Sequence, residues 1–205
     1  GCDVTVIERG RTARESSWAG GGILSPLYPW RYLDSISALA EASQAVYADL
    51  VAQLHHDTGI DPELEPCGLA LIAPEEESTA IEWAGRRGVD LQRIDGAALQ
   101  TLEPALAQQP DSALWMPAVG QVRNPRLAKA LARDLLLRGV TVHEQTPLQD
   151  VLMSQDRVRG IRTPHGEVEA DAVVVCAGAW TADLLKDLPD PPYVRPVRGQ
   201  MILFR

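Results

Sequence analysis

The strongest constraint on the fold lies in the first 23 residues. Residues 4–7 are three β-branched valine and isoleucine side chains around Thr5, a run that favours a buried parallel strand, and Glu8 ends it. A carboxylate at the end of such a strand can accept hydrogen bonds from both hydroxyls of a ribose. Residues 20–22 are consecutive glycines, which let backbone N–H groups approach an anion or a flat ring. These features predict a dinucleotide-binding α/β fold.

The composition excludes several classes of partner. The net charge of −9 disfavours binding to nucleic acid or to an anionic membrane, since both need a basic surface. The longest apolar stretch, residues 172–180, is far shorter than the roughly 20 residues that span a bilayer. Three scattered cysteines and four histidines without ligand spacing predict neither disulfides nor a metal site. We therefore expect a cytoplasmic globular protein, for which a homo-oligomer stays open.

Hydrophobic periodicity predicts alternating helices and strands. The longest helix is expected at 36–58, with Leu39, Val46 and Leu54 on one apolar face and Gly59 as its end. Trp30, Trp83 and Trp115 are expected to pack in a core or an interface. Other helices are expected at 75–88, 124–138 and 181–186, and strands at 68–73, 113–116, 140–143, 148–153, 157–163, 171–176 and 199–204.

The strand at 171–176 is expected to be parallel and buried on both faces, with Cys176 as a core residue rather than a nucleophile. It would bring the small-residue turn at Ala177 and Gly178 to the carboxyl edge of the sheet, where ligands bind in open α/β folds. No Ser/His/Asp arrangement, paired carboxylates or P-loop is visible, so we predict no catalytic side chain within the chain. Each candidate also has a purely structural explanation that stays open. Glu8 would be a solvated charge at a strand end, the glycine loop a flexible linker, and the turn at 177–178 a tight strand–helix junction.

Three segments, residues 4–10, 16–26 and 171–180, together resemble the D-amino-acid oxidase family of FAD enzymes, and within it the bacterial glycine oxidases of thiamine biosynthesis. The resemblance implies an FAD-binding Rossmann-like domain of the glutathione-reductase type, with an inserted, mainly antiparallel α+β substrate domain. The first would comprise 1–60 and 122–190, and the second 61–121 and 191–205. We expect both to be incomplete, because the first βα unit would precede Gly1 and the family's substrate-binding arginine and tyrosine would follow Arg205.

The resemblance also implies a reaction and a set of cofactor contacts. A small amino acid or amine would lose a hydride to the flavin, its imine would hydrolyse, and oxygen would be reduced to hydrogen peroxide. Without its missing ends the chain is expected to be inactive and to bind FAD weakly. The implied FAD contacts are Glu8 and Arg9 at the adenosine ribose, Ser16 and Ser17 near the pyrophosphate, Gly21, Gly22 and Ile23 along the flavin ring, Leu148 at the adenine, and Ala177 and Gly178 near the cofactor.

Several alternatives stay open beside this reading. A dehydrogenase of the same fold would pass electrons to an acceptor other than oxygen, and sarcosine-type or tRNA-modifying enzymes share the wider group. A non-catalytic nucleotide-binding module is disfavoured because residues 194–204 resemble the start of a substrate-domain sheet. A nicotinamide enzyme is disfavoured because the three-glycine loop follows Glu8 so closely.

Overall fold

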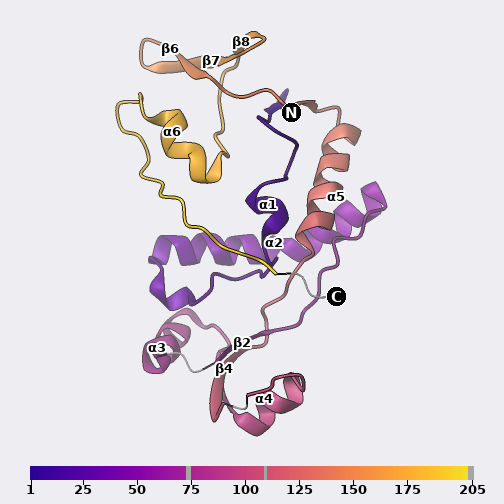
Figure 1. Cartoon of the computed structure of the whole chain (residues 1–205), viewed down its shortest axis with the longest axis vertical. Helices are drawn as coiled ribbons and strands as arrows, with labels where there is room; N and C mark the ends of the chain where they lie inside the picture. Colours follow the sequence, from indigo (N-terminus) through magenta and orange to yellow (C-terminus); the bar gives the residue numbers. More distant parts are fainter. Residues whose placement is uncertain (73–74, 109, 203–205) are drawn as a thin grey trace. The chain divides into compact units, whose positions relative to one another are not determined.

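The structure is a computed structural model that describes residues 1–72, 75–108 and 110–202. The chain divides into two compact units (Figure 1). Unit 1 comprises Gly1–Ala19 with Ala132–Arg205, and unit 2 comprises Gly20–Leu131. Both units combine helices with small sheets, so the predicted α/β class is confirmed. The two predicted domains and their boundaries stay a prediction.

Unit 1 contains a parallel pair of short strands, β1 (Thr5–Ile7) and β5 (Thr141–His143). Val6 lies opposite Val142 in the register. β-branched residues favour this extended backbone because their stiff side chains pack well on a pleated surface. The strands expected at 4–7 and 140–143 are confirmed, each beginning one residue later than predicted.

The second sheet of unit 1 is an antiparallel meander in the order β6-β7-β8 (Figure 1). Leu152 and Ile161 are buried in it. β7 has the predicted bounds, and β6 begins two residues later than predicted. β8 was not predicted, because its Gly-Glu-Val-Glu run is too short and too charged to signal a strand. The three strands of this sheet are β6 (Asp150–Ser154), β7 (Arg157–Thr163) and β8 (Gly166–Glu169). Unit 1 also contains α1 (Ser16–Ala19), η2 (Gly178–Trp180) and α6 (Thr181–Leu185).

Unit 2 is built on an antiparallel sheet in the order β2-β4-β3. Its central strand β4 pairs with both neighbours. Neither β3 nor α4 was predicted from the sequence. The unit contains η1 (Pro29–Arg31), α2 (Asp34–Thr58), β2 (Leu69–Ile72), α3 (Glu77–Arg87), β3 (Gln92–Asp95), α4 (Gly96–Leu102) and β4 (Ser112–Met116), and α5 (Asn124–Leu137) begins in unit 2 and ends in unit 1.

The core of unit 2 lies between its sheet and α3. Leu114 of β4 and Ala80 of α3 are fully buried, and Trp83 and Trp30 join the same cluster. The Trp30 indole N–H donates to the Glu76 carboxylate at 3.0 Å, which satisfies its one polar atom at the edge of the core. The expectation that Trp30 and Trp83 pack in a core is confirmed.

The helix α2 ends where the sequence predicts but packs differently. Gly59 caps it in the left-handed conformation, with φ of 71°, and its N–H donates to the His55 carbonyl at 2.9 Å. Leu54 is buried as expected, whereas Leu39 is 70% exposed and Val46 is also exposed, so the predicted apolar face is wrong over the first part of the helix. Spacing shows which residues share a face, but not which turns of that face meet another element.

Arg87 at the end of α3 binds two carboxylates of α2. Its Nε and Nη2 donate to the two oxygens of Glu41 at 2.7 and 3.0 Å, and its Nη1 donates to Asp34 at 3.2 Å. The Arg87 side chain is only 18% exposed, and its hydrogen bonds hold the pKa of Glu41 below the ordinary value of 4.5. This bidentate pairing fixes the two helices against each other.

Two strands expected near the end of the chain are wrong. Residues 171–176 form no strand, Val174 is 84% exposed and Cys176 is exposed rather than in a core. A run of valines forms a strand only when a neighbouring strand pairs its backbone, and no described strand pairs with this segment. Residues 199–202 form no strand either, and 203–204 lie outside the described residues.

One position in unit 2 accepts only glycine. Residues 22–24 pair with residues 120–122, and the Val122 N–H donates to the Gly22 carbonyl at 2.9 Å. Gly22 has φ of +76°, and a Cβ there would lie 1.8 Å from the Val122 carbonyl oxygen. Both the backbone conformation and the available space therefore exclude a side chain at Gly22.

We expect Gly22→Ala to lower the free energy of unfolding by about 3 kcal/mol or more, the sum of a left-handed alanine and an overpacked contact. Gly59→Ala is the matched control, since Gly59 has φ of +71° but nothing within 4 Å of the added carbon. It should cost only about 1 kcal/mol. Urea unfolding measures both, and equal losses would contradict the role of the Val122 contact.

Candidate functional site

The end of β1 presents Glu8 in a defined geometry. The Glu8 N–H donates to the His143 carbonyl at 2.9 Å, and its own carbonyl accepts from the Thr146 N–H at 2.8 Å. The Gly10 N–H donates to Glu8 Oε1 at 2.6 Å. Glu8 is half-buried, and its carboxylate is oriented by this local bond; no ion pair to it exists within the part of the chain that the structure describes.

The oxygens of Glu8 suit a polyhydroxyl ligand. Among the described residues, no protein group is recorded on Glu8 Oε2, while Oε1 retains a second lone pair beside the Gly10 N–H. A carboxylate with this acceptor capacity can take hydrogen bonds from two adjacent hydroxyls, as the ribose of a nucleotide offers. The residues present at the end of β1 therefore fit the ribose of FAD.

Arg9 lies next to Glu8 and contacts two other segments. Its Nη2 donates to Glu15 Oε1 at 2.9 Å, and its guanidinium carbon lies 3.7 Å from the centre of the Trp180 ring. Trp180 closes the turn that begins at Ala177 and Gly178. The structure thus brings together two of the stretches predicted as cofactor contacts, residues 8–9 and 177–178, within unit 1.

The loop after β5 is held beside the end of β1. The Gln145 N–H donates to the Gly10 carbonyl at 2.8 Å, and Thr146 is buried with its hydroxyl donating to the Glu144 carbonyl at 3.0 Å. Leu148 follows two residues later and is half-buried. Main-chain hydrogen bonds therefore place the segment that leads to Leu148 next to the Glu8–Gly10 loop.

Glu144 fixes the loop that leads to Ser16 and Ser17. Its Oε1 accepts the Thr12 N–H at 2.7 Å. Hydrogen bonds from Thr12, with smaller contributions from the charges of Arg11 and Arg14, hold the pKa of Glu144 below its ordinary value. Ser16 and Ser17 form the start of α1, and both are exposed.

Ala177 and Gly178 begin the 3₁₀ turn η2. Ala177 is half-buried, and its carbonyl accepts the Trp180 N–H at 3.1 Å. Gly178 has φ of +52° with open space around its α-carbon, a conformation that suits glycine. The sharp turn predicted after residue 176 is confirmed, although it follows an irregular segment instead of a strand.

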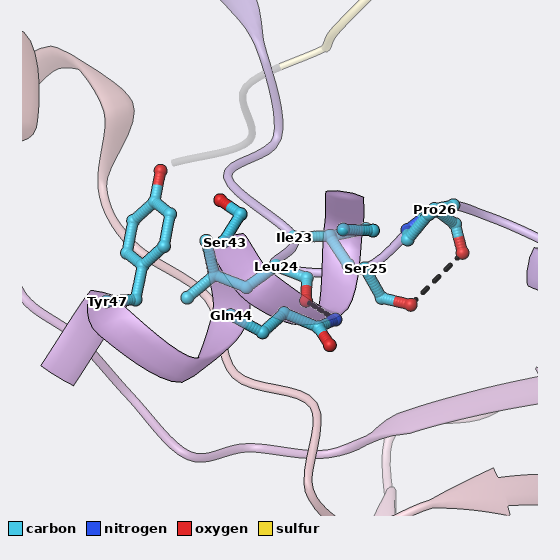
Figure 2. Close-up of a pocket in the computed structure, with 8 residues that line it drawn as sticks. Ile23, Leu24, Ser25, Pro26, Ser43, Gln44 and Tyr47 are labelled. Atoms are coloured by element: carbon cyan, nitrogen blue, oxygen red, sulfur yellow. Dashed lines mark hydrogen bonds between the residues drawn. The ribbon is translucent and has the colours of Figure 1, made fainter. Parts of the chain in front are cut away.

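Gly21, Gly22 and Ile23 belong to unit 2, whereas the other predicted cofactor contacts belong to unit 1. Ile23 lines an open cavity of about 200 Å³ beside α2 (Figure 2). In Figure 2 the side chains of Ser43, Gln44 and Tyr47 come from that helix, and Gln44 Nε2 donates to the Leu24 carbonyl. The full lining is Ile23, Leu24, Ser25, Pro26, Ala40, Ser43, Gln44 and Tyr47.

The contribution of α2 to this cavity was not predicted from the sequence. A signal was present, because Ala40, Ser43, Gln44 and Tyr47 follow the i, i+3, i+4, i+7 spacing of one helix face. That face lines the cavity opposite residues 23–26. The sequence alone does not show that residues 23–26 lie against it.

Within residues 1–72, 75–108 and 110–202, no group of three or more His, Cys, Asp or Glu side chains is arranged to hold a metal ion. The same part of the chain contains no helix that is both long and apolar enough to cross a membrane.

Comparison with known proteins gives consistent relatives over the whole chain. Residues 1–205 match a protein-family model described as FAD dependent oxidoreductase. Glycine oxidase of Pseudomonas aeruginosa is 42% identical over 206 residues, which cover 100% of this chain and 57% of that protein. Glycine oxidase of Pseudomonas putida is 43% identical, covering 98% of this chain and 56% of its own length. The chain therefore spans little more than half the length of these relatives.

A solved structure agrees with this comparison. Glycine oxidase from Bacillus cereus superposes with a TM-score of 0.79 at 30% identity, covering 91% of this chain and 51% of that chain. L-amino acid deaminase from Proteus vulgaris superposes with a TM-score of 0.78 at 18% identity, covering 93% of this chain and 45% of that chain, and this likeness concerns the fold alone.

The lowered pKa of Glu144 predicts a specific pH dependence. Because the folded-state pKa lies below the ordinary 4.5, the bond to Thr12 stabilises the fold above about pH 4.5 and is lost as pH falls through the folded pKa. Glu144→Gln should therefore lower the urea midpoint at neutral pH, and the difference from the unmodified protein should shrink on acidification. A difference independent of pH would contradict the charged hydrogen bond.

Proposed function

Because the chain belongs to the family of FAD-dependent oxidoreductases, we propose that its complete gene product oxidises glycine or another small amino acid or amine. With glycine, water and oxygen as reactants, the products would be glyoxylate, ammonia and hydrogen peroxide. The observation that supports the proposal most directly is the Glu8 carboxylate at the end of β1, with acceptor capacity left for a ribose.

Unit 1 would hold the adenosine end of FAD. Glu8 would accept the ribose hydroxyls, and Arg9 lies beside it at the same strand end. The Leu148 backbone would meet the adenine, and the fixed loop before α1 would present the hydroxyls of Ser16 and Ser17 to the pyrophosphate. Each contact is part of the proposal, supported by the hydrogen bonds that hold these loops side by side.

The flavin end would lie along Gly21, Gly22 and Ile23, with Ala177 and Gly178 also near the cofactor. The pairing of residues 22–24 with 120–122 supports this role, because it fixes the backbone of the glycine loop before any ligand binds. The proposed domains are an FAD-binding domain of 1–60 and 122–190 and a substrate domain of 61–121 and 191–205.

When bound, FAD would supply the two-electron acceptor for amine oxidation. The residues of this chain would contribute binding and orientation: a carboxylate for the ribose, ordered loops for the phosphates and a small-residue backbone beside the ring. We propose no general acid or base among the residues of this chain.

The relatives also suggest a cellular role. A protein of Synechocystis named bifunctional protein ThiO/ThiG is 30% identical over 206 residues, 98% of this chain and 29% of that protein. We extend the proposal to a cytoplasmic enzyme that serves thiamine biosynthesis and uses oxygen as its electron acceptor. The free, exposed cysteines Cys2, Cys67 and Cys176 support a reducing compartment.

Glu8→Gln should weaken FAD binding by about 10- to 100-fold, the loss expected when a charged acceptor of two hydrogen bonds becomes neutral. Glu169→Gln is the matched control, since Glu169 is an exposed carboxylate of the same unit on β8. Titration of the apoprotein measures both affinities. Equal affinities for the two variants would contradict the ribose role of Glu8.

Peroxide release by the complete gene product with FAD, in air, tests the activity. Glycine, sarcosine and D-alanine are compared, and we expect peroxide with glycine. Flavin bleaching without peroxide would show a dehydrogenase that uses another acceptor. Absence of bleaching with all three substrates would contradict the amino-acid proposal.

A further inference from the structure

Trp180 lies at the end of the turn η2 and contacts Arg9 just after β1. The Arg9 guanidinium lies over its indole ring at 3.7 Å from the ring centre. The segment before the turn, residues 171–176, pairs with no described strand. This stacking contact therefore links the turn to Arg9, the residue next to Glu8.

Arg9 needs such a contact to keep one position. Its side chain is 45% exposed, and a free arginine side chain populates many rotamers, all but one of which must be given up to hold a ligand. The indole face attracts the cation through the ring quadrupole, and Glu15 binds the edge of the same guanidinium at 2.9 Å. A face contact and an edge contact together restrict both the position and the tilt of the guanidinium plane.

We propose that Trp180 is a positioning residue that holds Arg9 beside Glu8 and thereby increases selectivity for FAD over FMN, which lacks the adenosine. The inference rests on the proposed function, since it requires Arg9 to act at the adenosine end of FAD. Trp180 contacts Arg9 and takes effect through it.

The test measures Kd for FAD and for FMN with the apoprotein of the complete gene product. Trp180→Leu should weaken FAD binding by about 2- to 5-fold, the loss of an exposed cation–π contact, and leave FMN binding unchanged. Trp180→Phe, which keeps an aromatic face, should lose less. Tyr193→Leu is the control for removing an exposed aromatic ring, since Tyr193 is 90% exposed, and it should leave both affinities unchanged.

A double-mutant cycle separates positioning from a general structural effect. If Trp180 acts through Arg9, Trp180→Leu should add no loss of FAD affinity in an Arg9→Ala background. Should Trp180→Leu fail to fold, as circular dichroism would show, Trp180→Phe and Arg9→Ala give the same cycle.

Three results would overturn the inference: unchanged FAD affinity of Trp180→Leu, an equal loss for FAD and FMN, or additive losses in the cycle. If the unmodified protein binds FAD and shows one of them, only the role of Trp180 fails. If the unmodified protein binds no flavin, the proposed function fails as well.

Discussion

The candidate site of unit 1 depends on the parallel pairing of β1 with β5. The backbone hydrogen bonds of this pair continue past the ends of both strands, from Glu8 to His143 and from Thr146 back to Glu8. A further bond joins Gln145 to Gly10. These main-chain bonds keep the loops after the two strands adjacent. Main-chain bonds therefore provide much of the constraint on the site, and the Glu144 side chain adds to it through Thr12.

Local signals predicted the parts of the fold that depend on local chemistry. Gly59 ends α2 where the sequence predicts, because a glycine cap acts within a few residues of the chain. The strand expected at 171–176 is absent because a strand also needs a partner, and composition does not reveal one. The missed strand β3 reads Gln-Arg-Ile-Asp, and its membership in the sheet comes from pairing with β4 instead of from its own propensity.

The candidate site was predictable to a similar degree. Glu8 could be singled out because a charged residue at the end of an apolar strand is conspicuous, and the structure shows its backbone and carboxylate both engaged. The contact between Arg9 and Trp180 could not be predicted, because the two residues lie at opposite ends of the sequence. Neither could the helical wall of the cavity at Ile23, whose residues only become relevant once α2 lies beside residues 23–26.

The pairing of Arg87 with α2 has a mechanical consequence for that cavity. Glu41, which Arg87 holds by both oxygens, lies on α2 between the wall residues Ala40 and Ser43. Sliding α2 along its axis by a single residue, about 1.5 Å, would pull both oxygens away from the guanidinium together. The pair therefore opposes sliding of α2, and a charge on α3 helps to keep the wall residues of α2 in register with Ile23.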